Sequence, residues 1–345
     1  MKKRVVALVL ALALTMGLTS GLVLADDGET SGTCGENLIW VLEDGVLTIS
    51  GTGEMDDCTN EYGSPDDAPW EDVKEEITSV VIESGVTSIG DCAFYVCSGL
   101  ESVSLPSTLT SIGDCAFQCC FNLTDIEIPE GVTTIGDCAF MQCSSLESIV
   151  IPEGVTYLGS EAFGFCFNLV YVSLPSTLEH IESSTFNLCY SIENIEIPEG
   201  VTSIGWGAFA REYMTGEISD DPTSLTSISL PSTLTSISKY AFYSCGNLTD
   251  IYYAGTEEQW NEISIEEYND PLLNATIHYS SVSDSVDSDD TGSSSDVSDT
   301  SLSIIDSETA ASYTLGSGGS AVIAVDADIA DFVSVTVDGV VLTGY

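Results

Sequence analysis

A phenylalanine that returns at a fixed interval constrains the fold of this 345-residue chain more than any other feature. It sits in one near-identical stretch after another, such as LESVSLPSTLTSIGDCAFQCCFN (100–122) and LTDIEIPEGVTTIGDCAFMQCSS (123–145). The members of the series are Phe94, Phe117, Phe140, Phe163, Phe186, Phe209 and, after one longer step, Phe242. A fixed period of this length, with apolar residues spaced L-x-x-I-x-L, predicts a solenoid of stacked repeats.

Each repeat is expected to form one rung of an α/β leucine-rich-repeat solenoid, made mostly of short parallel strands. The strand ends near a proline because proline lacks the N–H that a sheet requires. The D-x-A-F-x-x-C segment then turns the chain back, as a single helical or 3-10 turn. Since no rung can bury its own apolar face, stacking makes one continuous core, with the phenylalanines as an internal ladder of offset rings.

The region before the repeats is predicted to divide at residue 25. Residues 1–25 have the pattern of a secretory signal peptide: Lys2, Lys3 and Arg4, then an apolar run, then small residues at the cleavage positions. A membrane anchor is the alternative, but these flanks fit cleavage better. Residues 26–76 are expected to form an N-terminal cap, because LIWVLEDGVLTIS (38–50) reads as a β-hairpin turning at Asp44 and Gly45.

The remainder divides into three parts. Residues 77–279 are predicted to be the solenoid with its C-terminal cap, which gains Trp260 and several tyrosines. Residues 280–310, almost entirely Ser, Asp, Thr and Val, are predicted to be a disordered acidic linker. Residues 311–345 alternate apolar and polar side chains, with strands expected at 321–325 and 332–337, and are interpreted as the start of an incomplete immunoglobulin-like module.

The cysteines fall into columns that repeat with the rungs. Of the twelve cysteines, six lie three residues after a repeat phenylalanine and three lie two residues before one. Columns at the repeat period are core positions, where a thiol behaves as a small apolar side chain, so buried thiols are favoured over disulfides. Cys34 and Cys58 lie outside the columns and are the best candidates for one disulfide. No cysteine pairs have the spacing of a zinc site, so no metal is predicted.

The chain is strongly acidic, with 55 Asp and Glu residues against 6 Lys and Arg and a formal net charge of −49. After removal of the signal peptide, the basic residues are Lys74, Arg211 and Lys239. Such a surface repels phosphate backbones and anionic lipids, so nucleic acid is excluded as a partner, and no membrane insertion is expected. The charge favours solubility and does not by itself choose a ligand.

The exposed face of the solenoid follows from the alternation of side chains along each strand. Positions three and five of each rung are mostly small and polar, with scattered acids and two tyrosines. The candidate partner-binding residues there are Asp125, Glu127, Tyr171, Asn194, Glu196 and Tyr252. One rung is ten residues longer than the others, and its extra residues lie within AREYMTGEISDDPTS (210–224). Arg211 in this insertion is the seventh candidate, because insertions in solenoids form loops that can bind partners.

Catalysis finds little support in the sequence. The two histidines, His180 and His278, lie on different rungs, and no serine sits in a G-x-S-x-G motif. Acidic residues are abundant, but no spacing singles out a pair as acid and base. We therefore expect a protein that is not an enzyme and uses no cofactor.

The repeats resemble those of the BspA-like leucine-rich-repeat family. The resemblance rests on L-x-S-I-x-L-P…T-x-I-G-x-x-A-F-x-x-C, intact at 100–120, with CGENLIWVLEDGVLTISGTGEM (34–55) before the repeats and YYAGTEEQWNEI (252–263) at their end. The segment from Tyr313 is similar to the start of an X2-type immunoglobulin-like module of bacterial surface proteins. The family resemblance implies an exported bacterial protein. Some members of the family are adhesins for host matrix proteins or other cells.

Two functions follow as expectations. The first is a secreted or cell-surface binding protein, adhesin-like, whose solenoid engages an extracellular protein of a host matrix or another cell. The alternative is a non-catalytic recognition or spacer module of a larger extracellular polysaccharide-degrading protein, which would make polysaccharide the ligand.

Overall fold

The computed structural model describes residues 30–59, 68–211 and 224–280, and the backbone of four strands between residues 300 and 342. It divides into two compact units, Met1–Val282 and Ser283–Tyr345, of which the first contains the repeats. The predicted signal peptide, most of the predicted linker and most of the long-rung insertion lie outside the described residues.

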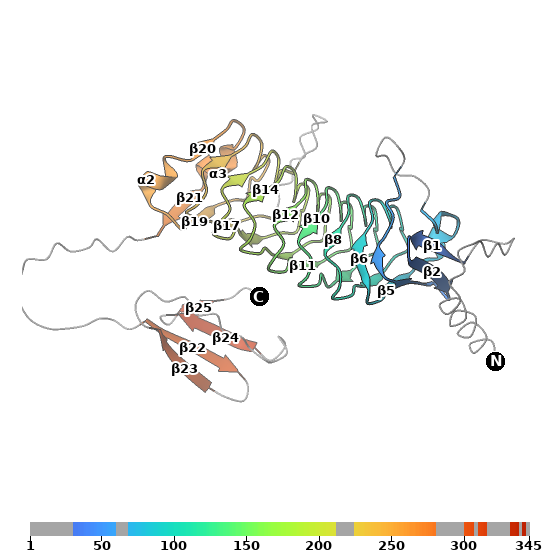
Figure 1. The fold of residues 1–345 in the computed structure, drawn as a ribbon. Coiled ribbons are helices and arrows are strands. Elements are labelled where there is room, and N and C mark those ends of the chain that lie inside the picture. The colour runs from blue at the N-terminus through green and yellow to red at the C-terminus, as the bar shows by residue number, and fades with distance from the viewer. Residues whose placement is uncertain are drawn as a thin grey trace, which may run out of the picture. The chain divides into compact units, whose positions relative to one another are not determined.

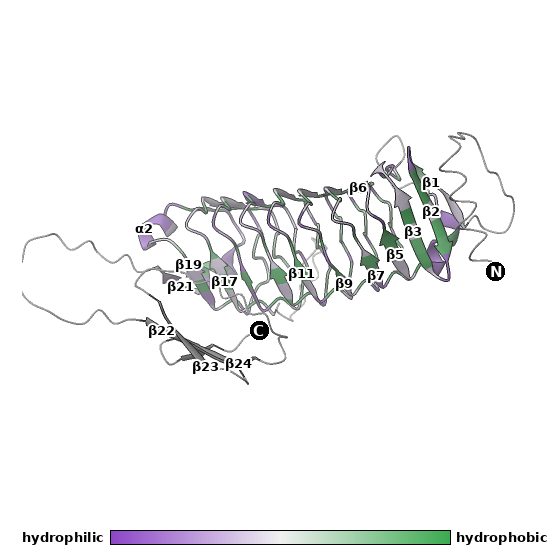
Figure 2. Ribbon diagram, turned by 60° about the horizontal axis from the view of Figure 1, so that its bottom comes forward, coloured by the Kyte–Doolittle hydropathy of each residue, from purple (hydrophilic) through white to green (hydrophobic). Residues whose placement is uncertain are grey.

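The N-terminal cap is a three-stranded antiparallel sheet of β1 (Ser31–Gly35), β2 (Leu38–Glu43) and β3 (Val46–Gly51). Asp44 and Gly45 join β2 to β3 with φ angles of 51° and 81°, as a two-residue hairpin turn requires, so the predicted hairpin is confirmed. Strands β2 and β3 are predominantly apolar, as their green colour in Figure 2 shows. A 3-10 helix, η1 (Glu71–Glu76), follows the cap sheet.

The rungs stack so that their strands form two columns (Figure 1). The first column continues from the cap, because β3 pairs in parallel with the first rung strand. Its strands are β5 (Ser79–Ile82), β7 (Ser102–Ser104), β9 (Asp125–Ile126), β11 (Ser148–Val150), β13 (Tyr171–Ser173), β15 (Asn194–Glu196), β17 (Ser227–Leu230), β19 (Asp250–Tyr253) and β21 (Thr276–Tyr279).

The second column consists mostly of two-residue strands, and in six rungs a proline lies between the two strands. Its strands are β4 (Gly53–Glu54), β6 (Val86–Ile89), β8 (Ser111–Ile112), β10 (Thr134–Ile135), β12 (Tyr157–Leu158), β14 (His180–Ile181), β16 (Ser203–Ile204), β18 (Ser236–Ile237) and β20 (Ser264–Ile265). Pairing is parallel in both columns, and a strand residue pairs with the equivalent position of the next repeat, as Thr134 does with Tyr157. The repeat period therefore sets the register directly.

The D-x-A-F-x-x-C segments differ from the prediction of a helical or 3-10 turn. In the described rungs they are successive turns with left-handed residues, for example Cys115 at φ 55° and Cys119 at φ 62°. Alternate backbone N–H groups donate to the next rung, as Phe117 does to the carbonyl oxygen of Ala139 at 2.8 Å, and those between them bond within the rung, as Gln118 does to the carbonyl oxygen of Cys115 at 3.1 Å. Hydrogen bonds between rungs therefore alternate with single-turn bonds within one rung, and no continuous helix forms.

The phenylalanine column forms the predicted internal ladder. Neighbouring rings from Phe94 to Phe242 have centroids 5.1 to 5.9 Å apart and are nearly parallel. Trp70 starts the stack at 5.3 Å from Phe94 and donates its indole N–H to the carbonyl oxygen of Ala93. The longer step between Phe209 and Phe242 does not interrupt the stack, because their centroids are 5.3 Å apart.

The column cysteines that follow the phenylalanines are thiols with a defined role. The Sγ of Cys143 donates to the carbonyl oxygen of Phe117, one rung back, at 3.3 Å. The same bond to a phenylalanine of the preceding rung is made by Cys120, Cys166, Cys189 and Cys245. These thiols are buried, and through this hydrogen bond each one joins its rung to the preceding rung.

The predicted disulfide between Cys34 and Cys58 is not formed. Both side chains are buried, and Cys58 directs its Sγ toward the carbonyl oxygen of Asp56, 3.9 Å away. Burial, followed by the nearby charges of Asp56 and Cys58, raises the pKa of the Cys34 thiol to about 12. A neutral, buried thiol is a poor nucleophile for disulfide exchange.

Thiol alkylation tests this arrangement. Burial raises the pKa of the Cys97 and Cys166 thiols to about 12, so both are protonated and inaccessible at pH 8. We expect iodoacetamide to leave the six column cysteines that follow the phenylalanines unmodified in the native protein, and to modify all twelve cysteines after unfolding without reductant. Partly exposed Cys115, Cys119 and Cys138 should react first. Mass spectrometry gives the count, and an unreduced, unfolded chain with fewer than twelve modifiable thiols would contradict the prediction.

A row of aspartates also joins the rungs. Asp57, Asp91, Asp114 and Asp137 each accept, through Oδ1, the backbone N–H of the equivalent residue one rung later, at 2.8 to 2.9 Å. The last of these donors is Ser160. Each carboxylate thereby satisfies a backbone group that the turn would otherwise leave without a partner.

The C-terminal cap contains two short helices, α2 (Glu257–Trp260) and α3 (Asp270–Asn274). Thr256 and Gln259 form a capping box at the start of α2. Asn269 Oδ1 accepts the backbone N–H of Phe242 at 3.0 Å, so the N–H of the last phenylalanine in the ladder has a hydrogen-bond partner. Strand β21 then adds to β19 in parallel and ends the first column.

The second unit is a four-stranded antiparallel sheet in the order β23-β22-β24-β25. Its strands are β22 (Thr300–Asp306), β23 (Ala310–Leu315), β24 (Phe332–Val337) and β25 (Val340–Leu342). Strand β24 matches the predicted strand at 332–337, whereas the one predicted at 321–325 lies outside the described residues. Strand β22 lies within residues 280–310, which were predicted to be a disordered linker. The sequence there alternates apolar Leu302 and Ile304 with serines, which is the pattern of a strand.

Candidate functional site

The outward side of the first-column strands, here called the strand face, carries most of the predicted partner-binding residues. Buried apolar side chains alternate with outward-pointing ones along these strands, as Ile149 does with Ser148 and Val150 in β11 and Val172 with Tyr171 and Ser173 in β13. Six of the seven candidates lie on this face outside the core: Asp125, Glu127, Tyr171, Asn194, Glu196 and Tyr252. None of these side chains belongs to the core, so all are available to a partner.

Arg211, the seventh candidate, is placed differently from the expectation. It is buried, and its guanidinium carbon lies 5.1 Å from the centroid of the Tyr190 ring. Its backbone N–H donates to the carbonyl oxygen of Tyr243, in the turns rather than the strand face. The cation packs on an aromatic ring and is not presented to a partner, which corrects the prediction. The rest of the insertion, residues 212–223, lies outside the described residues.

The middle of the strand face has an exposed apolar patch. Val150 and Tyr171 are 58% and 56% exposed, and Val170, which directly precedes β13, is 54% exposed. Ser148 pairs with Tyr171 and Val150 with Ser173, so Val150 and Tyr171 lie diagonally opposite on neighbouring strands. Exposed apolar side chains that gather on one face are typical of a surface that contacts another molecule.

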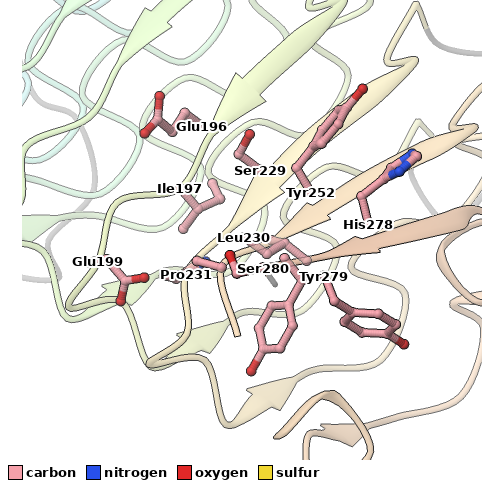
Figure 3. Close-up of a pocket in the computed structure, with 12 residues that line it drawn as sticks. Glu196, Ile197, Glu199, Ser229, Leu230, Pro231, Tyr252, His278, Tyr279 and Ser280 are labelled. Atoms are coloured by element: carbon pink, nitrogen blue, oxygen red, sulfur yellow. The ribbon is translucent and has the colours of Figure 1, made fainter. Parts of the chain in front are cut away.

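The C-terminal end of the strand face holds an aromatic stack. The rings of Tyr252 and His278 are nearly parallel, with centroids 4.8 Å apart, and project side by side from β19 and β21 (Figure 3). His278 Nε2 lies 2.7 Å from Oδ1 of Asp250. The hydrogen bond from His278, followed by one from Thr249, lowers the pKa of the Asp250 carboxyl.

A pocket of about 360 Å³ lies beside this stack, lined by strands β15, β17, β19 and β21 and the residues that follow them (Figure 3). Its apolar part comes from Ile197, Leu230 and Pro231, and two carboxylates, Glu196 and Glu199, lie at its edge. Glu199 also accepts hydrogen bonds from the backbone N–H and the hydroxyl of Ser232, at 2.9 and 3.1 Å, which fix its position.

Tyr253 is also among the residues that line this pocket. The residue is only 2% exposed, and its hydroxyl oxygen is buried with no hydrogen-bond partner among the described residues. Burial, followed by the charges of Glu199 and Glu262, raises the pKa of the Tyr253 hydroxyl. It therefore stays protonated at neutral pH.

Sequence reasoning did not bring His278, Tyr279 or Glu199 to this site. A signal was present, because TIHY (276–279) repeats the alternation of DIYY (250–253), and the structure pairs Tyr252 with His278 and Tyr253 with Tyr279. The segment reads as a departure from the repeat because the step from Tyr252 to His278 is longer than the regular step between rungs. Because of this longer step, the repeat period does not reveal β21 as a further strand of the first column.

The other histidine, His180, does not lie at this site. His180 lies on the second column, with Nδ1 2.8 Å from the hydroxyl of Ser203, and is exposed. Within residues 30–59, 68–211 and 224–280, no group of three His, Cys, Asp or Glu side chains could hold a metal ion. No helix in the described part of the chain has the length and apolar character needed to cross a bilayer.

Comparison with known proteins finds one family and several solved structures. The family model described as "BspA type Leucine rich repeat region" matches in six copies, over residues 73–190, 116–219 and 179–270. No curated protein matches the chain. A leucine-rich repeat protein from Bacteroides ovatus is 24% identical with a TM-score of 0.46, over 76% of this chain and 72% of its own.

Two further structures are similar to this chain. A leucine-rich repeat protein from Eubacterium ventriosum is 28% identical with a TM-score of 0.39, and the match covers 65% of this chain and 72% of its own. The T. pallidum leucine rich repeat protein is 26% identical with a TM-score of 0.39, and the match covers 52% of this chain and 87% of its own.

Proposed function

Because this chain belongs to the BspA-type leucine-rich-repeat family, we propose that it is a secreted or cell-surface binding protein whose strand face engages a protein partner. Repeats of this family are common in surface proteins that mediate protein interactions, and they are typically non-catalytic modules. The observation that carries the proposal is the strand face itself. Its side chains point outward, contribute nothing to the core, and combine the Val150–Tyr171 patch with carboxylates.

The chemistry of this face favours an extracellular protein, of a host matrix or another cell's surface. A central apolar and aromatic patch with a polar rim has the composition of a protein–protein interface. The net charge of −49 repels nucleic acid and anionic lipid, and attracts proteins with basic surfaces. The charge is spread along the solenoid, so it steers a partner's approach more than it selects one partner.

A binding screen with the full chain tests the proposal. Immobilised matrix proteins and insoluble plant polysaccharides are compared at physiological and high salt. We expect saturable binding to a protein that persists at high salt, because the apolar patch is not screened. The double variant Tyr171→Ala/Glu127→Gln should bind at least about tenfold more weakly, as loss of one aromatic anchor commonly does.

The matched control is the double variant Tyr157→Ala/Glu179→Gln. It removes the same two residue types, but Tyr157 belongs to the second column and both side chains are exposed away from the strand face. This variant should bind as the parent does. If the strand-face variant also binds as the parent does, another surface is the site.

The Tyr252–His278 stack supports one alternative function. An exposed aromatic ring beside a carboxylate can also stack on a sugar ring, as a recognition or spacer module of a polysaccharide-degrading protein would require. Binding to polysaccharide alone in the same screen would favour this alternative over the protein-binding function.

A further inference from the structure

We propose that Cys115 and Cys138, on neighbouring rungs, form a modification site at which a low-molecular-weight disulfide oxidises the two thiols to a reversible disulfide bond. This inference does not depend on the partner that the strand face binds. It is carried by the backbone geometry that stacks the two cysteines, by their exposure, and by their place in a row of three thiols that begins at Cys92.

The turns place these three cysteines at equivalent positions of successive rungs. Cys92, Cys115 and Cys138 are all left-handed, with φ angles of 58°, 55° and 56°. The backbone N–H of Cys115 donates at 2.8 Å to the carbonyl oxygen of Asp137, the residue that directly precedes Cys138. The N–H of Cys92 donates in the same way to Asp114, directly before Cys115. The three side chains therefore leave the backbone in the same direction, one rung apart.

The distance between rungs allows a disulfide, with some strain. Equivalent residues of neighbouring strands lie about 4.8 Å apart, and disulfides join Cα atoms that are about 4.4–6.8 Å apart. The Cβ atoms of a disulfide are about 3.8 Å apart, so two parallel side chains must lean together by about 1 Å. The bond can therefore form, and it is more easily reduced than an unstrained disulfide.

The thiols of the row are already in contact. Cys115 forms side-chain hydrogen bonds with both Cys92 and Cys138. The bond with Cys115, followed by burial, raises the pKa of the Cys138 thiol, and burial raises the pKa of the Cys92 thiol to about 11, so both keep their protons at neutral pH. Cys92 is also 4% exposed, whereas Cys115 and Cys138 are partly exposed. An oxidant in solution therefore reaches these last two thiols of the row.

The reaction is thiol–disulfide exchange in two steps. The Cys115 sulfur attacks one sulfur of the oxidant, so a mixed disulfide forms, and the oxidant's other half leaves as a thiol with the Cys115 proton. The Cys138 sulfur then attacks the Cys115 sulfur, and the remaining half of the oxidant leaves as a thiol with the Cys138 proton. Two protein thiols are thereby oxidised, and one small disulfide is reduced to two thiols. Excess small thiol reverses both steps.

The other cysteines of the turns lack such a neighbour. The thiols three residues after the phenylalanines are buried and donate to backbone carbonyls, as Cys143 does to Phe117. Cys119 is partly exposed, but the equivalent positions of the rungs before and after it hold Val96 and Gln142. Its Sγ lies 3.1 Å from Oε1 of Gln142. Cys119 can therefore form a mixed disulfide but has no thiol in line with it on a neighbouring rung.

The test treats the folded full chain, reduced and then freed of reductant, with oxidised glutathione, and blocks the remaining thiols with iodoacetamide in urea. A protease that cleaves after acidic residues separates the two cysteines, because Glu127 and Glu130 lie between them and no lysine or arginine does. By mass spectrometry we expect a cross-linked peptide pair that joins Cys115 to Cys138 and exceeds any other cysteine cross-link at least about tenfold. Excess reduced glutathione should remove it.

Two variants identify the thiols that react. In Cys138→Ser, Cys115 has only the buried Cys92 beside it in the row, so its cross-linking should fall at least about tenfold and its mixed disulfide with glutathione should accumulate. Cys119→Ser is the matched control, because it removes a partly exposed thiol of the same turns. Its yield of the Cys115–Cys138 bond should stay within about twofold of the parent's. Melting temperatures confirm that each variant is folded.

Three outcomes would overturn the inference. The first is a parent chain in which Cys115 cross-links no more than it does in Cys138→Ser. The second is a main product that joins Cys115 to a cysteine other than Cys138. The third is loss of the bond in Cys119→Ser, which would place the reaction elsewhere in the turns. Because none of these measurements involves a binding partner, such a result would leave the proposed function standing.

Discussion

Replacing Phe140 with alanine is expected to destabilise the solenoid by about 3–5 kcal/mol, the usual cost of deleting a fully buried phenylalanine ring. Phe140 is 0% exposed and is stacked between Phe117 and Phe163, each with its centroid 5.3 Å away. Rungs on both sides close the cavity, so collapse around it is limited. The loss also weakens the coupling between neighbouring rungs, on which the stability of a repeat array depends.

Urea denaturation followed by circular dichroism measures this effect. The variant's midpoint should fall, and its transition should broaden, because the halves of the array on either side of Phe140 are less tightly coupled. Phe121→Ala is the matched control, since Phe121 is 40% exposed and outside the ladder, and its removal should cost less than about 1 kcal/mol. An unchanged midpoint for Phe140→Ala would show that the ladder does not hold the rungs together.

Replacing Gly136 with alanine is expected to cost about 3 kcal/mol, because the added methyl group has no room. A Cβ at this position would collide with Oδ1 of Asp114, and it would lie 2.6 Å from the backbone nitrogen of Asp114 and 2.7 Å from the carbonyl carbon of Gly113. Two of these three atoms are backbone, so the rungs themselves must move apart. Separation of the rungs would also lengthen the hydrogen bond from Gly136 N–H to the carbonyl oxygen of Ile112.

Gly164→Ala is the control for this substitution. Its added Cβ would have no contact shorter than 3.3 Å, and the equivalent position one rung earlier holds Met141. Its melting temperature should stay within a few degrees of the parent's, whereas that of Gly136→Ala should fall clearly below it. Equal melting temperatures for the two variants would mean that close approach of the rungs is not what requires glycine at 136.

The repeat period predicted most of the solenoid because one constant fixes several features at once. The regular step between rungs places Phe117 beside Phe140, pairs Thr134 with Tyr157, and separates buried from exposed strand positions. Once one rung is assigned, the others follow. The exposure of Tyr171 and Tyr252 could be predicted for the same reason.

What the sequence did not reveal depends on contacts between rungs or on a changed spacing. The segment around Phe117 has the local composition of a helical turn, but alternate N–H groups donate to the next rung, which no local pattern reports. The aspartate row went unnoticed for the same reason, since acidic residues are abundant everywhere in this chain. The pocket was missed because β21 follows β19 after a longer step than the regular one, so His278 and Tyr279 fall outside the regular columns of the sequence.

Arg211 and the Cys34–Cys58 pair show a different limitation. The Arg211 prediction relied on its place in the insertion and on being one of few cations, and the disulfide prediction relied on two cysteines outside the columns. Rarity identifies a residue as unusual but does not say where its side chain points. The structure turns Arg211 onto Tyr190 and leaves Cys34 as a buried thiol.

The aspartate row gives the array a direction. From Asp57 to Asp137, each carboxylate accepts a backbone N–H from the rung that comes later in the chain. A finished rung therefore already holds the acceptor and the aromatic ring onto which its successor docks. The cap hairpin precedes all the rungs in the chain, so each rung that folds after it finds its template in place. Folding can proceed from the cap rung by rung, and a chain that ends after several whole rungs would already hold those rungs in their final register.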